Sequence, residues 1–203
     1  MDAFVLNPES KPVFMCCDLQ EKFAPAFGHN FELAAFVAKR LLAAHGAFHA
    51  AGAGTRFVVT EQYPKGLGPT CSDVAEAAAA QPALFKYEKT KFSMMVDEVD
   101  AAVGDAASFV LFGIEAHVCV LQTVADLRMR GKNVFVVVDG TFSQRDGDRD
   151  VAFRTMERMG ATLTTSEAVL FQLLGDKNHA AFKAVSALCR DKPPAPLATA
   201  SVA

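Results

Sequence analysis

The sequence lacks an apolar run that approaches the roughly 18 residues needed to span a bilayer, so no membrane partner is expected. Its first ten residues, MDAFVLNPES, have neither the apolar core of a signal peptide nor the arginines of a transit peptide. It also lacks an excess of positive charge, because 20 basic and 23 acidic residues give a net charge of −3. We therefore expect a cytoplasmic protein whose partner is not a nucleic acid.

Motifs that hold metals and nucleotides are missing as well. The five cysteines form no CxxC pair and no Cys/His cluster, so we expect reduced thiols and no metal site. There is no GxGxxG or Walker sequence. The segment 113–115 stands where a dinucleotide-binding fold would carry its glycine motif, but it does not contain that motif. These absences predict a protein that needs no cofactor.

Short apolar strands alternate with helices along the chain, which is 51% hydrophobic and long enough for one core. This order predicts a three-layer αβα fold around a Rossmann-like, six-stranded parallel sheet. One domain is expected over 1–191, followed by a disordered Pro/Ala-rich tail at 192–203. Strands are predicted at 13–17, 55–60, 109–114, 133–138 and 161–164, and helices at 31–51, 72–80, 96–103, 118–129, 148–159, 167–174 and 179–189.

Two segments are not assigned to a helix or a strand. The prolines and glycines of 61–69 (EQYPKGLGP) predict an irregular loop that lines a pocket, and 84–95 (LFKYEKTKFSMM) mixes basic and aromatic residues. The Ala- and Leu-rich helices at 31–51 and 118–129 have more apolar surface than one sheet covers. They predict a homo-oligomer.

Chemically useful side chains follow the predicted strand ends, where open α/β sheets bind their ligands. Asp18 follows the first strand, Lys86, Lys89 and Lys91 lie in the basic segment, and Cys119 lies in the first turn after the central strand. A carboxylate that accepts a thiol proton, with an ammonium beside the sulfur, would make a nucleophilic site. Each residue also has a structural interpretation, as a turn cap, a surface charge or a small buried side chain, and spacing does not decide between them.

Three segments resemble the signature segments of the isochorismatase-like hydrolase (cysteine hydrolase) superfamily, in the family's order. They are 18–23 (DLQEKF), 89–94 (KTKFSM) and 113–120 (GIEAHVCV), and the resemblance covers 12–191. The segments EQYPKGLG, TSEA and LLGD are similar to the isochorismatase domain-containing subgroup. The chain also resembles trypanosomatid members named mitochondrial-associated ribonuclease, a name that implies a mitochondrial association although no presequence is recognisable here.

The resemblance implies a catalytic triad and an oxyanion hole. It makes Asp18 the general base, Cys119 the nucleophile and Lys89 the triad lysine, with Lys91 as the close competitor. It also implies a non-proline cis peptide between Ile114 and Glu115, and an oxyanion hole formed by the backbone N–H groups of Glu115 and Cys119.

A substrate pocket is expected beside the triad. A histidine two residues before the nucleophile invites a Cys/His dyad, but side chains at that spacing diverge at a helix start, so His117 is expected to have a structural or pocket-lining role. Several of the aromatic and apolar candidates could equally be ordinary core. The expected pocket residues are Gln20, Phe23, Glu61, Tyr63, Phe92, Met95, Ile114 and His117.

Two departures from relatives within the superfamily narrow the function. Nicotinamidases resemble one another in a D-x-H-x3-H metal site after the second strand, and 61–69 contains no histidine. The groups that recognise isochorismate are also not identifiable. We predict a metal-independent cysteine hydrolase of a small amide or carbamoyl-type substrate that acts through a thioester-like intermediate. The alternatives are a non-catalytic scaffold and a ribonuclease-associated protein, although acidic residues interrupt the basic stretches 85–92 and 145–154.

Overall fold

The computed structural model describes residues 6–194, and most of the predicted tail 192–203 lies outside the described residues. A six-stranded sheet with the order β3-β2-β1-β4-β5-β6 forms its centre, and every pair of neighbouring strands is parallel. The predicted six-stranded parallel sheet is therefore confirmed. The strands are β1 (Val13–Cys17), β2 (Arg56–Gln62), β3 (Leu84–Lys89), β4 (Ser108–Ile114), β5 (Asn133–Phe142) and β6 (Thr162–Thr164).

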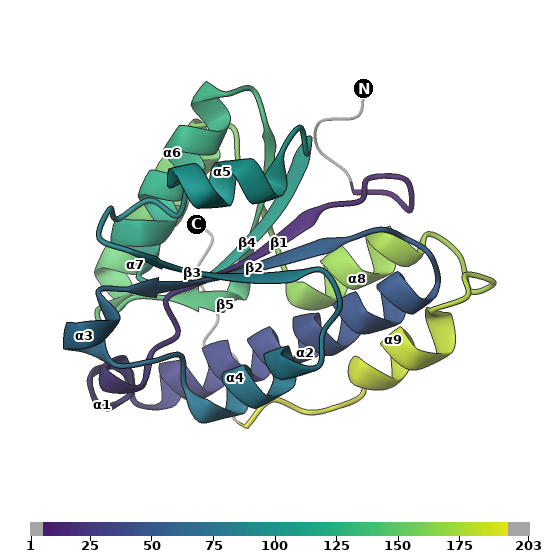
Figure 1. The fold of residues 1–203 in the computed structure, drawn as a ribbon, viewed down its shortest axis with the longest axis horizontal. Helices are drawn as coiled ribbons and strands as arrows, with labels where there is room; N and C mark the ends of the chain where they lie inside the picture. The colour runs from purple at the N-terminus through teal and green to yellow at the C-terminus, as the bar shows by residue number, and fades with distance from the viewer. Residues whose placement is uncertain (1–5, 195–203) are drawn as a thin grey trace.

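Helices cover both faces of the sheet and give the predicted three layers. Figure 1 shows α5, α6 and α7 on one face and α2, α4, α8 and α9 on the other. The helices are α1 (Ala24–Phe27), α2 (His29–Ala50), α3 (Pro64–Leu67), α4 (Ser72–Ala79), α5 (Asp97–Val103), α6 (Leu121–Met129), α7 (Asp146–Arg158), α8 (Ser166–Leu174) and α9 (Phe182–Leu188), with a 3-10 turn η1 (Glu21–Phe23) and a π-helical turn η2 (Ala116–Val120). None of the helices in residues 6–194 combines the length and the apolar character that crossing a membrane requires.

The two faces of the sheet hold separate apolar cores, because successive side chains of a strand point to opposite sides. Every residue of β1 and β4 is buried, as expected for central strands of a parallel sheet. Cys16 packs into the core under α2, and its neighbour Cys17 packs into the core under α5, α6 and α7. Cys17 therefore faces the same layer as Cys119.

Three sequence expectations need correction. The segment 61–69 is not irregular throughout, because β2 continues to Gln62 and Pro64 starts the short helix α3. Proline fits the first position of a helix, where its missing N–H is not needed. The segment 84–95, which was not assigned to a helix or a strand, contains the edge strand β3. The strand predicted at 133–138 is longer, because β5 continues to Phe142 beyond an irregularity in its pairing with β4.

Gly113 allows β4 to pass very close to β1. Its φ is +115°, and a Cβ at this position would lie 2.2 Å from the carbonyl oxygen of Cys17. The register pairs Gly113 directly with Cys17. Only glycine fits here, and this close approach carries the chain from β4 into η2 beside the end of β1.

Candidate active site

Asp18 and Cys119 follow adjacent strands at the same edge of the sheet. The chain leaves β1 toward β2 and β3 on one side and returns to β4 on the other side, so the strand order reverses between β1 and β4. Open α/β sheets bind ligands at this switch point, outside the carboxyl ends of the strands. The predicted edge is therefore the place where the two side chains meet.

Lys89 and Asp18 form a buried ion pair. The Nζ of Lys89 lies 2.7 Å from Oδ2 of Asp18, and the two side chains are 0% and 1% exposed. Thr60 donates its hydroxyl to the other carboxylate oxygen at 2.7 Å. The ammonium also donates to Oε1 of Gln62 at 2.7 Å and to the carbonyl of Phe92 at 2.9 Å. Both charges are thus hydrogen-bonded in fixed positions, which a buried pair requires.

The ammonium of Lys89 is held in its charged form. Burial alone would lower the pKa of Lys89, but the neighbouring acidic side chains of Cys17, Asp18 and Cys119 and the hydrogen bond to Asp18 raise it, and the net pKa lies above the ordinary lysine value. The site therefore contains a permanent positive charge at neutral pH.

Cys119 completes the cluster. Its Sγ, the Sγ of Cys17 and a carboxylate oxygen of Asp18 all lie within 4.8 Å of one another. Cys119 is 7% exposed, in the turn η2. Its carbonyl accepts a hydrogen bond from the hydroxyl of Thr123 at 2.7 Å, and that hydroxyl accepts one from the N–H of Met94 at 2.9 Å. These bonds tie the cysteine turn to the segment that follows Lys89.

The structure separates the two competing lysines. Nζ of Lys91 lies 2.8 Å from the carboxylate of Asp126 and 3.1 Å from the carbonyl of Met95, and the Lys91 side chain is 51% exposed. Among residues 6–194, Lys89 is the lysine that contacts Asp18. Lys86 is also engaged elsewhere, 3.3 Å from Glu61.

The backbone between β4 and η2 presents polar groups at the same place. The peptide bond between Ile114 and Glu115 is cis. Within the part of the chain that the structure describes, the N–H of Glu115 donates to no protein acceptor. The Glu115 side chain is held by Gln144, whose Nε2 donates to it at 3.0 Å.

Four of the expected pocket residues lie where they can border the cluster. Met95 is buried in the same core as Cys119. Tyr63 follows the end of β2, Phe92 follows the end of β3, and both rings are about half exposed. The ring nitrogens of His117 face Ser143 at 2.9 Å and Glu115 at 3.5 Å, which fits the expected structural or pocket-lining role.

Glu61 does not line this space, contrary to the sequence prediction. Side chains alternate along β2, so Thr60 and Gln62 face Asp18 and Lys89 whereas Glu61 points to the other face of the sheet. There its carboxylate accepts the N–H and the hydroxyl of Thr70, both at 2.7 Å. Glu61 anchors the return of the chain toward α4.

Three other expected pocket residues have structural positions instead. The buried side chain of Gln20 donates to the carbonyls of Gln62 and Gly68 and accepts from the N–H of Gln62, so it braces the segment after β2. Ile114 lies in the core under α2, on the opposite face from Cys119. Phe23 packs edge-on against Phe27 and joins that same core.

Sequence reasoning missed Cys17, Thr60 and Gln62. All three lie at the carboxyl ends of strands, and the register pairs Cys17 with Thr60 and Gln62 with Lys89. Only Cys17 could have been found from the sequence, because it directly precedes Asp18. The other two contacts depend on strand order and register, which spacing does not give.

The donor set of the cluster suits a nucleophile better than a metal. Cys17, Asp18 and Cys119 offer two sulfurs and a carboxylate at metal-binding spacing. However, the ammonium of Lys89 lies 2.7 Å from the only carboxylate of this set and already supplies the positive charge. The arrangement combines a thiol, a proton acceptor and a fixed cation, which is the equipment of covalent catalysis by cysteine.

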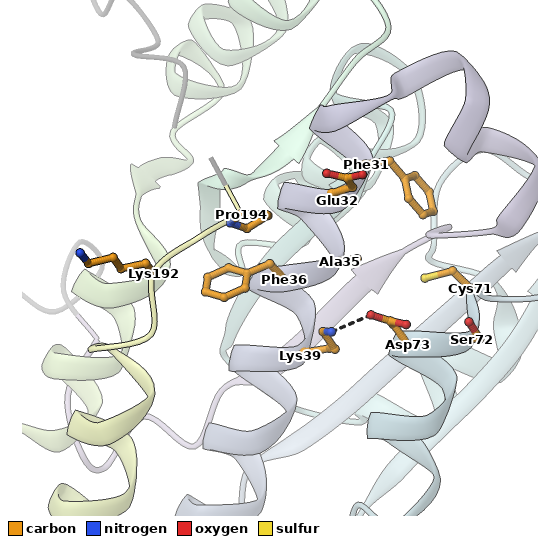
Figure 2. A pocket seen from close by; sticks show the side chains of 10 residues that line it. All are labelled: Phe31, Glu32, Ala35, Phe36, Lys39, Cys71, Ser72, Asp73, Lys192 and Pro194. Atoms are coloured by element: carbon orange, nitrogen blue, oxygen red, sulfur yellow. Dashed lines mark hydrogen bonds and ion pairs between the residues drawn. The ribbon is translucent and has the colours of Figure 1, made fainter. Parts of the chain in front are cut away.

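A separate groove of about 470 Å³ lies on the α2 face (Figure 2). Phe31, Ala35 and Phe36 of α2 form its apolar wall, and an ion pair of 2.7 Å between Lys39 and Asp73 lies at its side. Its lining contains none of the residues of the Asp18, Lys89 and Cys119 cluster. The groove is therefore distinct from the candidate active site.

Comparison with known proteins gives one consistent result. Residues 12–168 match the isochorismatase domain. Isochorismatase domain-containing protein 1 of Salmo salar is 41% identical over 185 residues, which are 90% of this chain and 62% of that protein. The chain thus spans less than two thirds of that relative's length.

Solved structures agree with this similarity. A Leishmania donovani protein provisionally named MAR1 ribonuclease superimposes with a TM-score of 0.86 at 38% identity, over 97% of this chain and 100% of that one. The Escherichia coli YcaC gene product, an octameric hydrolase of unknown specificity, has a TM-score of 0.73 at 17% identity, over 91% and 88% of the two chains. The latter likeness concerns the fold alone.

Proposed function

The chain belongs to the isochorismatase family, whose members are hydrolases, and from this premise we propose that it hydrolyses a small amide or carbamoyl-type substrate with Cys119 as the nucleophile. The observation that carries the proposal is the buried ion pair of Lys89 and Asp18 beside the Cys119 sulfur. A carboxylate that accepts the thiol proton and an ammonium that balances the thiolate are what the attack of a cysteine needs.

The reaction begins with transfer of the Cys119 proton to Asp18. The thiolate then attacks the carbonyl carbon, and the negative charge that develops on the substrate oxygen is accepted by the N–H groups of Glu115 and Cys119. The free N–H of Glu115 supports this role. The tetrahedral intermediate collapses, the carbon–nitrogen bond breaks, and protonated Asp18 gives its proton to the departing amine.

The second half of the reaction uses the same groups with water. Asp18, again a carboxylate, accepts a proton from a water molecule that attacks the thioester carbon. The carbon–sulfur bond then breaks, the acid product leaves, and the proton returns from Asp18 to the Cys119 sulfur. Lys89 remains charged throughout, since the cluster keeps its pKa above the ordinary value. No metal takes part in this sequence of steps.

A homo-oligomer forms part of the proposal. The apolar side chains of α2 are largely buried within the chain itself, so they no longer support an interface. Exposed Met129 and Met159 remain at the ends of α6 and α7, where Arg128 donates to the carbonyl of Met159 at 3.2 Å. These methionines support self-association through this end of the molecule, and YcaC, which shares the fold, is octameric. Light scattering that gives only a 21.7 kDa monomer would refute it.

The name of the Leishmania protein supports a second candidate, a ribonuclease-associated role. The charges in the segment around β3 argue against it. Lys86, Lys89 and Lys91 each pair with a carboxylate, so they do not form a free basic strip for a phosphate backbone. RNA binding that weakens steeply with salt would restore this candidate, and its absence would leave the hydrolase.

The proposed function is tested by ammonia release from a panel of small primary amides and carbamoyl compounds. Wild-type protein is compared with Cys119→Ala and with Cys71→Ala, which removes a half-buried thiol of the α2 face. Turnover that Cys119→Ala abolishes and Cys71→Ala retains supports the proposal. Equal rates of ammonia release in all three proteins would show that the reaction does not use Cys119. If Cys119 also failed to react with electrophiles, a non-catalytic scaffold would be the favoured function.

A further inference from the structure

A second thiol lies inside the candidate active site, and the hydrolysis above does not use it. The Sγ atoms of Cys17 and Cys119 lie within 4.8 Å of each other, both in the core under α5, α6 and α7. The Sγ of Cys17 also donates to Oδ2 of Asp18 at 3.5 Å. We infer that Cys17 is a resolving thiol, which forms a disulfide with Cys119 after a hydroperoxide has oxidised Cys119.

The backbone holds the two thiols on converging elements. Cys17 is the last residue of β1, and its register partner Gly113 approaches so closely that a Cβ would lie 2.2 Å from the Cys17 carbonyl oxygen. From Gly113 the chain passes into η2, which carries Cys119. The two cysteines are thus brought together by the sheet itself and not by a mobile loop.

Bond formation requires the sulfurs of Cys17 and Cys119 to move closer together. A disulfide has a sulfur–sulfur length of about 2.05 Å, so the sulfurs must approach from their separation in the reduced protein. Cys119 is slightly exposed in the π-helical turn whereas Cys17 is fully buried in β1, so we assign this approach to movement of the Cys119 side chain. The neighbouring Cys16 cannot take part, because its side chain lies in the core on the other face of the sheet.

The chemistry balances with a hydroperoxide as the oxidant. The Cys119 thiolate attacks the outer peroxide oxygen, the oxygen–oxygen bond breaks, and an alcohol (or water, from hydrogen peroxide) leaves after it gains a proton. Cys119 is then a sulfenic acid. The sulfur of Cys17 attacks the sulfenic sulfur, its proton passes to Asp18, and the displaced hydroxide takes a proton to leave as water. Two thiols are oxidised and one peroxide is reduced.

The protonation states fit this order of events. Burial raises the pKa of the Cys17 thiol well above its ordinary value, and the hydrogen bond with Cys119 and the charge of Asp18 add to the rise. Cys17 therefore stays a neutral thiol in the reduced protein, and Cys119 reacts with the oxidant first. The Asp18 carboxylate beside Cys17 removes its proton only when the sulfenic acid is present to be attacked.

The inference rests on the nucleophilic Cys119 of the proposed function, but not on the hydrolysis of any substrate. The disulfide joins the sulfur that would attack a carbonyl, so the oxidised protein has no nucleophile and is inactive until a thiol reductant restores it. In the absence of Cys17, the sulfenic acid would react with more peroxide and reach the sulfinic acid, which thiol reductants do not reverse.

The experiment treats the reduced 203-residue chain with hydrogen peroxide, blocks free thiols with iodoacetamide and maps the peptides by mass spectrometry without reduction. Wild type is compared with Cys17→Ala and with Cys16→Ala, a matched control, because both residues are fully buried neighbours in β1. Thermal unfolding confirms that each variant is folded, and Cys17→Ser serves as a second variant.

Wild type and Cys16→Ala should show a peptide pair joined through Cys119 that has lost two hydrogen atoms and separates on reduction. Cys17→Ala and Cys17→Ser should instead accumulate sulfinic Cys119. In wild type, oxidation of Cys119 to the sulfinic acid without a crosslink would overturn the inference. Labelling of Cys119 by iodoacetamide in a sample without peroxide would in that case still support the proposed nucleophile. Cys119 that reacts with neither reagent would overturn both.

Discussion

The ammonium of Lys89 lies 2.7 Å from the carboxylate of Asp18, a residue 71 positions earlier in the chain. Removing one partner of a buried pair leaves the other charge uncompensated, at a cost of about 3–5 kcal/mol. Lys89→Met should lower the free energy of unfolding by roughly that amount, as measured by denaturant titration. Lys91→Met removes the half-exposed pair with Asp126 and should cost less than about 1 kcal/mol. Equal losses of unfolding free energy in the two variants would show that the Lys89 and Asp18 pair contributes no more to stability than the half-exposed pair of Lys91 and Asp126.

The same pair predicts how stability changes at high pH. The pKa of Lys89 in the folded protein is above its ordinary value, so the folded protein holds this proton more tightly than the unfolded chain. The stabilisation is complete below the unfolded lysine pKa of about 10.4 and is lost as the pH rises through the higher folded pKa. The free energy of unfolding of wild type, measured at increasing pH, should therefore approach that of Lys89→Met. If the difference in unfolding free energy between wild type and Lys89→Met stayed constant as the pH rises, the raised pKa of Lys89 would be contradicted.

Gly113 should tolerate no side chain. A Cβ there would lie 2.2 Å from the Cys17 carbonyl oxygen at a φ of +115°, so Gly113→Ala should cost more than about 3 kcal/mol of stability. Gly147→Ala is the control, because it lies in α7 with no atom within 4 Å of the added Cβ. It should leave the protein equally stable or up to about 1 kcal/mol more stable. Thermal and denaturant unfolding measure both, and a mild effect at Gly113 would mean that β1 and β4 can move apart.

His117 should not act as the base of a Cys/His dyad. Its ring nitrogens face Ser143 and Glu115, so His117→Asn should change the alkylation rate of Cys119 by less than about threefold. The Asp18→Asn variant should lose about 100-fold or more of any hydrolytic turnover, because the general base is removed. Larger loss in His117→Asn than in Asp18→Asn would assign the proton transfer to the histidine.

The central strands could be predicted from the sequence because burial on both faces leaves a nearly continuous apolar run, as in β1 and β4. The edge strand β3 could not, since Lys86, Glu88 and Lys89 interrupt its apolar residues. Sequence spacing alone also could not decide whether Lys89 or Lys91 pairs with Asp18. Residues two apart share a face of an extended chain, and the partners Asp18 and Asp126 separate them only in the folded protein.

The polar groups that complete the site depend on long-range pairing. Thr60 and Gln62 reach Asp18 and Lys89 because β2 lies between β1 and β3 in parallel register, which no local pattern encodes. Conversely, Glu61 was expected to line the pocket because it begins the segment 61–69, which the sequence predicts to be a pocket-lining loop. The alternation of side chains along β2 sends it to the other face.

The most direct test of the central claim is the order in which the cysteines of the native protein react with iodoacetamide at neutral pH, followed by peptide mapping. We predict that Cys119, although 7% exposed, reacts before the half-buried Cys71 and Cys189. Folded Lys89→Met should lose this preference and Lys91→Met should keep it. Labelling of Cys71 and Cys189 ahead of Cys119 in wild type would contradict the claim that the Lys89 and Asp18 pair makes Cys119 a nucleophile.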